Sequence, residues 1–279
     1  MTPSPRSPLA RATLALLLAL ALGGCANLSA IAEFGRLSSD GVLYRRLTDE
    51  YVGSLHTMQD LTLKRQQQER DNLVPALAKR QALAPAALLM QQAVAEYMGA
   101  LAALAGDELV VLDDQVDDLA GAATKAELLG EQRAKTVASI GKLLTEAALN
   151  GYRQRQLATL IEAGNGPLQA LIADLTSVME RYAEQIQIEQ DQFNFHYRTL
   201  GAMATPGERA AAELIWAQQR SGARQFAPRR QAIASYIATI GKIGQAHQAL
   251  YDNRSRIADR EVHAQLKHYI KRIQAVRAD

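Results

Sequence analysis

Apolar residues recur every three to four positions along most of this 279-residue chain, and this spacing constrains the fold more than any other feature. Over residues 43–58, leucine, tyrosine and methionine fall on one side of a helical projection, while arginine, aspartate and glutamate fall on the other. Such a period is typical of an amphipathic α-helix. The alternation with a period of two that indicates β-strands is absent from the sequence. The sequence therefore predicts an all-α protein.

The expected helices follow one another with short interruptions at glycine and proline. They cover residues 43–58, 86–105, 108–123, 125–163, 168–200, 206–251 with a break or kink at Pro228, and 259–276. Pro75, Pro85 and Gly164–Pro167 are expected to end or start helices, because proline lacks an amide hydrogen and glycine is a poor helix former. Long helices joined by short turns favour antiparallel neighbours. We therefore predict an antiparallel bundle of about six to eight helices.

The first 24 residues have the layout of a secretory signal. Arg6 and Arg11 precede an apolar run of leucine and alanine over residues 12–22, and the run is followed by Gly23 and Gly24. This run is too short to cross a bilayer, because a hydrocarbon core of about 30 Å needs roughly 20 helical residues. We expect this segment to be removed and the mature chain to contain no membrane-spanning helix.

The residues Leu22, Gly23, Gly24 and Cys25 resemble the lipobox of bacterial lipoproteins, an aliphatic residue and two small residues before an invariant cysteine. The resemblance is confined to the first 25 residues and implies nothing about the fold or activity of the rest. It implies that Cys25 carries a diacylglycerol on its sulfur, that the chain is cut just before it, and that the new amino group is acylated. Three acyl chains would make release from a membrane negligible.

This resemblance also implies where the protein lies. In the enterobacterial lipoproteins that the segment resembles, aspartate after the cysteine favours retention in the inner membrane, whereas this chain has Ala26 there. The expectation is an outer-membrane anchor with the body facing the periplasm. The chain then divides into a signal peptide (1–24), a lipidated N-terminus and tether (25–40), and a helical bundle domain (41–279).

Composition argues against several classes of function. Cys25 is the only cysteine, so its lipidation leaves no thiol for a disulfide, a redox motif or a thiolate metal site. The chain has 31 lysines and arginines against 29 aspartates and glutamates, and the signal peptide accounts for the excess. A balanced body argues against binding to nucleic acid. We expect helix packing alone to stabilise the fold.

Motifs for catalysis are missing from the sequence. It contains no Gly-x-Ser-x-Gly turn, no glycine-rich phosphate loop and no His-Glu-x-x-His pair. Among the five histidines, His263 and His268 are five residues apart, whereas a helical metal pair is four apart. We expect no metal, no cofactor and no catalytic residue. One alternative stays open, a peptidoglycan-active enzyme that uses a single buried glutamate as general acid, although no particular glutamate is indicated.

A few side chains remain as candidates for contact with a partner. Phe195 lies off the helical face that Phe193 and Tyr197 share, which makes it a candidate for exposure at a contact surface, with ordinary core packing as the alternative. The other candidates are charged: Arg224, Arg229 and Arg230 around Pro228, and Asp113 and Asp117, a like-charge i,i+4 pair. Solvated charged faces are the simpler explanation of these charged residues.

These observations favour a binding function over catalysis. We predict a non-catalytic helical body, held to the membrane by its N-terminal lipid, that binds an envelope protein or a cell-wall partner. Within this class, an immunity-type lipoprotein that neutralises a toxin is an alternative.

Overall fold

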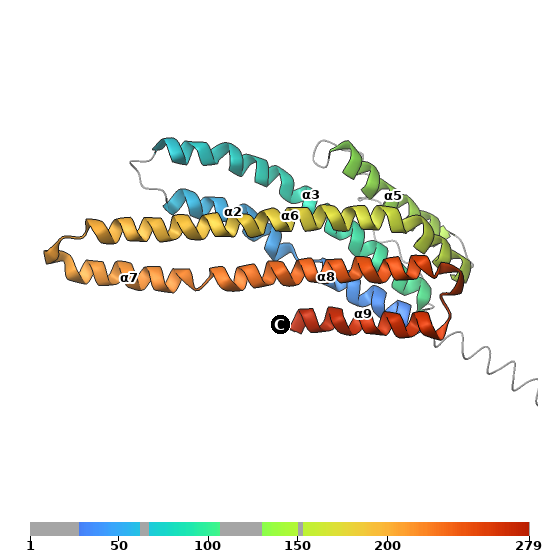
Figure 1. Cartoon of the computed structure of the whole chain (residues 1–279). Coiled ribbons are helices and arrows are strands. Elements are labelled where there is room, and N and C mark those ends of the chain that lie inside the picture. The colour runs from blue at the N-terminus through green and yellow to red at the C-terminus, as the bar shows by residue number, and fades with distance from the viewer. Residues whose placement is uncertain (1–27, 62–66, 107–129, 150–152, 279) are drawn as a thin grey trace, which may run out of the picture.

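Packed α-helices make up the protein. The computed structural model describes residues 28–61, 67–106, 130–149 and 153–278, and no strand occurs in this part of the chain. The helices lie side by side in an elongated bundle, with neighbours in antiparallel pairs such as α6 with α8 (Figure 1). The predicted all-α bundle is confirmed.

One long helix, α6, lies at the centre of the helix contacts. The helices are α2 (Arg45–Leu61), α3 (Gln67–Ala105), α5 (Glu131–Leu149), α6 (Arg153–Met203), α7 (Arg209–Ala223), α8 (Phe226–Asp252) and α9 (Arg260–Ala278). Single 3-10 turns lie at Pro206–Glu208 and Arg254–Arg256. At 1.5 Å per residue, the 51 residues of α6 span about 76 Å. The other helices except α9 pack along α6, and α9 packs on α8.

The bundle includes most of the segment expected to be a tether. Residues 28–42 are helical, and Ile31 and Phe34 are fully buried in the core. A Cβ atom added to Gly35 would lie 2.6 Å from the carbonyl oxygen of Met98, so this helix touches the backbone of α3. The body therefore begins by residue 28, and the boundary expected at residue 41 is wrong.

Proline does not end the helices where the sequence suggested. The helix predicted to start at Pro85 begins at Gln67 and runs through both Pro75 and Pro85. Each proline leaves the carbonyl four residues earlier without its helical partner, and these carbonyls belong to the exposed residues Asp71 and Gln81. Water can bond an exposed carbonyl, which lowers the cost of a proline inside a helix.

The expected interruption at Gly164–Pro167 is also absent, because α6 continues through it. Ala163, whose carbonyl Pro167 cannot bond, is exposed. Gly164 faces α3, and a Cβ atom there would lie 2.3 Å from the ring of Tyr97. Glycine is present because two helices approach closely at this level, and not because the chain turns.

Asn165, the next residue, belongs to a series of buried hydrogen bonds that accounts for a polar side chain at this position. Its Oδ1 lies 3.0 Å from Nδ1 of His247, and Nε2 of His247 lies 2.7 Å from the hydroxyl of Tyr97, which is also 3.0 Å from the carbonyl oxygen of Leu160. Since Oδ1 only accepts, Nδ1 of His247 carries the hydrogen. Burial lowers the pKa of His247 to about 3 and raises the pKa of Tyr97, so both are neutral near pH 7.

The helix predicted over residues 125–163 is two helices. α5 ends at Leu149, α6 begins at Arg153, and the two pack together with Nε of Arg133 3.1 Å from Oδ1 of Asp174. The breaker dipeptide Asn150-Gly151 lies between them in the sequence. The predicted apolar seam is still buried at the positions the structure describes: Val137, Ile140, Leu144, Leu157 and Ile161. The helix predicted over residues 108–123 lies outside the described residues.

Later boundaries match the predictions. Thr205 and Glu208 form the expected capping box, in which Oε2 of Glu208 accepts from the backbone nitrogen of Thr205 at 2.8 Å. The break expected near Pro228 falls between α7 and α8, and α9 covers the last predicted helix.

One described helix is long and apolar enough to span a membrane by length and composition, residues 71–105. Within it, 67% of the qualifying window is buried inside the protein, as in the core helix of a globular fold.

Candidate functional site

A hairpin projects from one end of the bundle. It consists of residues 193–223, the last turns of α6, the 3-10 turn and α7, and we call it the arm. Figure 1 shows the arm extending past the ends of α2 and α3. α7 packs mainly against α6, and none of its residues is buried.

Two glycines allow the helices of the arm to approach each other closely. A Cβ atom on Gly201 would lie 2.6 Å from the ring of Trp216, and one on Gly222 would lie 2.4 Å from the ring of Phe193. The side chains of Asn194 and Gln219 add a hydrogen bond of 3.1 Å between the helices. The arm is thus a paired hairpin whose outer faces are left to solvent.

The arm carries the three most exposed large apolar side chains of the described residues. Leu214 is 72% exposed, Met203 58% and Phe195 56%. Phe193, by contrast, is buried and packs edge-on against Phe226. The expectation that Phe195 lies off the packed face is confirmed. All three belong to one projecting hairpin, which makes the arm the candidate contact surface among the described residues.

Arg229 is not the free surface cation that the sequence suggested. Its two terminal nitrogens each donate to a carboxylate oxygen of Glu189 at 2.9 Å, and one also donates to the hydroxyl of Tyr182 at 3.0 Å. Burial lowers the pKa of Arg229, but the bonds to Glu189 and Tyr182 outweigh burial and raise it. Arg229 therefore belongs to the core as one half of an ion pair.

The remaining charged candidates do not converge. Arg230 donates to the side-chain oxygen of Gln190, whereas Arg224 is exposed at the base of the arm. Asp113 and Asp117 lie outside the described residues. Among the charged candidates that the structure describes, only Arg224 is exposed next to the arm.

Glu189 is the only buried glutamate among the described residues, and it is 1% exposed. A general acid needs a carboxyl group that holds a proton and faces a cleft. Both oxygens of Glu189 instead accept from Arg229, and the residue lines neither the cavity beside Tyr236 nor the hollow beside Tyr269. This arrangement holds the carboxylate as a structural acceptor.

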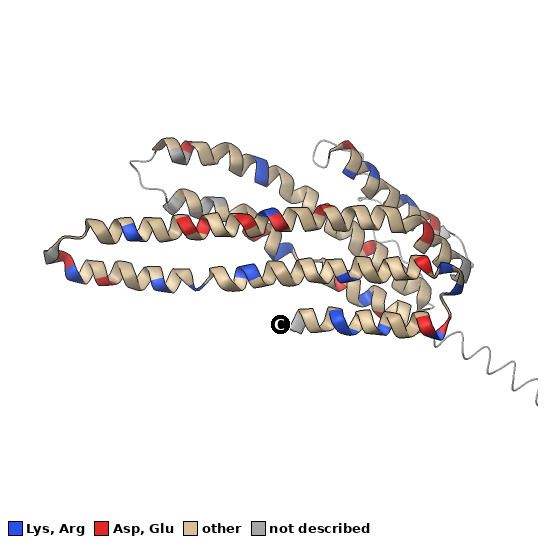
Figure 2. Ribbon diagram, in the orientation of Figure 1, with Lys and Arg blue, Asp and Glu red and all other residues tan. Residues whose placement is uncertain are grey.

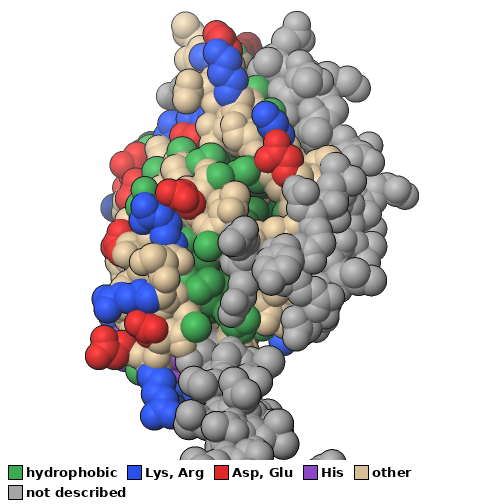
Figure 3. Space-filling model, turned by 90° about the vertical axis from the view of Figure 1, so that its right-hand side faces the viewer, with side chains coloured by type: hydrophobic (Ala, Val, Ile, Leu, Met, Phe, Trp, Pro, Cys, Tyr) green, Lys and Arg blue, Asp and Glu red, His purple; other side chains and the backbone are tan. Residues whose placement is uncertain are grey.

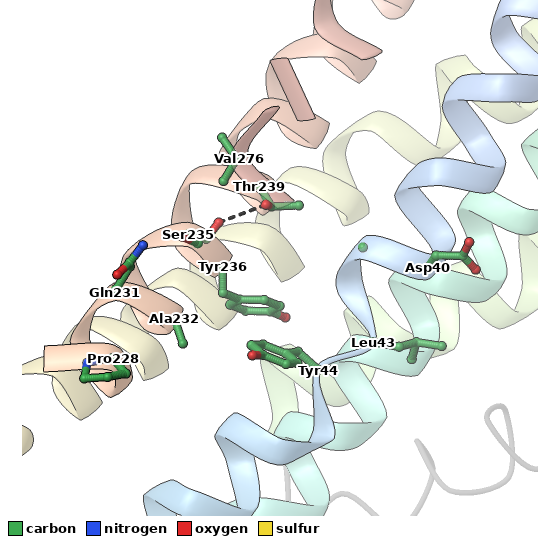
Figure 4. A pocket seen from close by; sticks show the side chains of 11 residues that line it. Asp40, Leu43, Tyr44, Pro228, Gln231, Ala232, Ser235, Tyr236, Thr239 and Val276 are labelled. Carbon is green, nitrogen blue, oxygen red and sulfur yellow. Dashed lines mark hydrogen bonds between the residues drawn. The ribbon is translucent and has the colours of Figure 1, made fainter. Parts of the chain in front are cut away.

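A cavity of about 420 Å³ opens between the end of the N-terminal helix, α8 and α9 (Figure 4). The rings of Tyr44 and Tyr236 form one wall with their centroids 6.0 Å apart, and Tyr236 donates to the carbonyl oxygen of Val42. Asp40 is the only charged residue of its lining. This lining suits an apolar group and holds no paired acid and base. No sequence pattern signals it, because its walls come from segments almost 200 residues apart.

The opposite end of the bundle is where residues 28–42 begin, beside the end of α3 (Figure 1). Figure 3 looks onto this end, where apolar side chains are visible near the centre and charges of both signs line one side. Across the described helices, basic and acidic residues are intermixed (Figure 2). No group of three or more potential metal ligands occurs among the described residues.

Comparison with known proteins places the chain in no group. No protein-family model, no curated protein and no solved structure matches it.

Proposed function

We propose that this chain is a lipid-anchored envelope protein whose helical body binds a protein partner through the arm and performs no chemistry. The observation that carries the proposal is the position of Phe195, Met203 and Leu214, the most exposed large apolar side chains of the described residues, on one projecting hairpin. Aromatic residues and methionine are enriched in protein interfaces relative to the rest of the surface.

The ends of the bundle support this orientation. Cys25, which resembles the acylated residue of bacterial lipoproteins, lies three residues before the first described helix. The arm lies at the far end of α6, a helix about 76 Å long. An outer-membrane anchor at Cys25 would hold one end of the bundle at the bilayer and present the arm to the periplasm.

The anchor is tested by Cys25→Ser. This variant should lose incorporation of labelled palmitate and should move from the membrane to the soluble fraction or accumulate as an uncut precursor. Unchanged labelling and detergent partitioning would contradict the lipoprotein assignment.

The arm is tested by capture of partners from envelope extract with the double variant Phe195→Ser/Leu214→Ser. The matched control is Val74→Ser/Leu83→Ser, which removes two exposed apolar side chains from α3, 55% and 39% exposed. Both variants should keep the far-ultraviolet dichroism of the parent, and only the arm variant should lose the captured protein. Equal capture by both would refute the role of the arm.

The two alternative functions, an immunity-type lipoprotein and a peptidoglycan-active enzyme, predict different results with the captured partner and the purified protein. A toxin recovered as the captured protein would identify an immunity-type lipoprotein. Release of cell-wall fragments by the purified protein, abolished by Glu189→Gln, would overturn the proposal in favour of an enzyme.

A further inference from the structure

A second hollow lies between α6, α8 and α9, distant from the arm, and its lining is rich in amides. Its volume is about 570 Å³, within the range of roughly 300–1,000 Å³ that small-ligand sites occupy. Five side-chain amides line it: Gln169, Gln245, Gln248, Asn253 and Gln265. We call this hollow the amide groove.

Hydrogen bonds from the core orient the amides of the groove. Oδ1 of Asn165 accepts from His247 and Gln169, so its Nδ2 donates to Oε1 of Gln248 at 2.9 Å. Nε2 of Gln248 then donates to Oδ1 of Asp252 at 2.8 Å. A chain of bonds thus runs from a fully buried histidine to a carboxylate in the groove, and each member fixes the orientation of the next.

This arrangement leaves a donor and an acceptor next to each other. Among the described residues, the second N–H of Gln248 and the second oxygen of Asp252 have no protein partner. A hydroxyl group both donates and accepts, so it can bond this pair at once. The groove also contains the half-exposed ring of Tyr269, against which the C–H face of a sugar ring can pack.

The charge of the groove selects among ligands. Asp252 is the only charged residue of the lining, and no lysine or arginine belongs to it. At the rim, Lys242 and Arg256 donate to the side-chain oxygens of Gln245 and Asn253 at 3.1 Å and 3.0 Å. The charge next to the free donor of Gln248 is the carboxylate of Asp252, which disfavours an anion at this pair. A neutral ligand with many hydroxyl groups suits both the amides and the aromatic ring.

We infer that the amide groove binds a neutral saccharide, with Gln248 and Asp252 bonding its hydroxyl groups and Tyr269 packing against a sugar ring. The inference does not rest on the arm, and it adds a second binding function at a separate surface.

Calorimetry with the lipidated chain in detergent tests this inference, with chitotetraose and maltotetraose as probes. Binding of chitotetraose alone would indicate an N-acetylated glycan such as that of the cell wall, and binding of maltotetraose would indicate a glucan. Tyr269→Ala and Gln248→Ala should each weaken binding about tenfold or more. Gln265→Ala changes an exposed residue and should leave the fold intact, and it should also weaken binding.

Controls separate the groove from the rest of the protein. Gln187→Ala removes an exposed amide of α6 outside the groove and should leave the affinity unchanged, as should the double variant of the arm. The groove variants should in turn keep the capture of protein partners. No saturable binding of either sugar at millimolar concentration, or equal affinity of the parent and all three groove variants, would overturn the inference.

Discussion

Acid should destabilise this protein through His247, a residue that is 0% exposed. Burial lowers its pKa from 6.5 to about 3 in the folded state, whereas the unfolded chain keeps the ordinary value near 6.5. The unfolded state therefore binds one more proton between these two values. The stability that neutral His247 provides is complete above pH 6.5 and is lost as the pH falls from 6.5 toward 3.

The magnitude follows from the distance between the pH and the unfolded pKa. At pH 5, which lies 1.5 units below the unfolded value of 6.5, protonation favours the unfolded chain by about 2 kcal/mol. The slope approaches about 1.4 kcal/mol per pH unit near pH 5 for this one group. Urea unfolding followed by circular dichroism at pH 7.5 and pH 5 measures the free energy of unfolding at both points.

Other groups also titrate in this range, so the variant His247→Gln isolates the contribution of the buried imidazole. The parent should lose about 2 kcal/mol more than this variant between pH 7.5 and pH 5, whatever the stability of the variant at neutral pH. His268→Gln, which removes an exposed imidazole, is the control for a general effect of histidine loss. An equal pH dependence of the parent and His247→Gln would refute the assignment of a neutral, buried His247.

Two further predictions concern glycine and charge inside the bundle. Gly164→Ala should destabilise the fold by about 1–3 kcal/mol in urea unfolding, because the added methyl group would meet a buried tyrosine ring. Gly53→Ala in α2 has open space and should stabilise the fold by about 0.5–1 kcal/mol. The opposite order would refute the close approach of α3 and α6. Arg229→Ala should cost about 3–5 kcal/mol in the same assay, because it leaves Glu189 buried without its partner. Lys135→Ala breaks an exposed pair and should cost little.

Helical periodicity predicted the fold class and the buried seams, because apolar spacing is a property of each helix taken alone. Val137, Ile140 and Leu144 are buried as their spacing indicated. Helix boundaries failed where a neighbouring helix decides the outcome. Gly164 and Pro167 carry the composition of a loop, yet contact with α3 and exposure of the affected carbonyl keep them helical.

Some features of the site residues could be predicted from local sequence, and others could not. The exposure of Phe195 followed from its position relative to Phe193 and Tyr197 on one helix. The pairing of Arg229 with Glu189 joins residues 40 positions apart on two helices, and only the packing of α6 against α8 brings them together. The amide groove combines three helices, so no local pattern predicts it.

The buried polar groups also explain how a bundle rich in alanine keeps one register. The face that α3 turns to the core contains many alanines over residues 86–105, and such a face offers few large side chains to interlock. A shift of α3 by one turn would separate Tyr97 from His247 and Arg80 from Gln185, leaving buried polar atoms without partners. These two contacts lie 17 residues apart on α3, about 26 Å, and so fix both its position and its rotation. Asn165 joins His247, the partner of Tyr97, to Gln248 by hydrogen bonds. The register of α3 that aligns the core therefore also orients the amide groove.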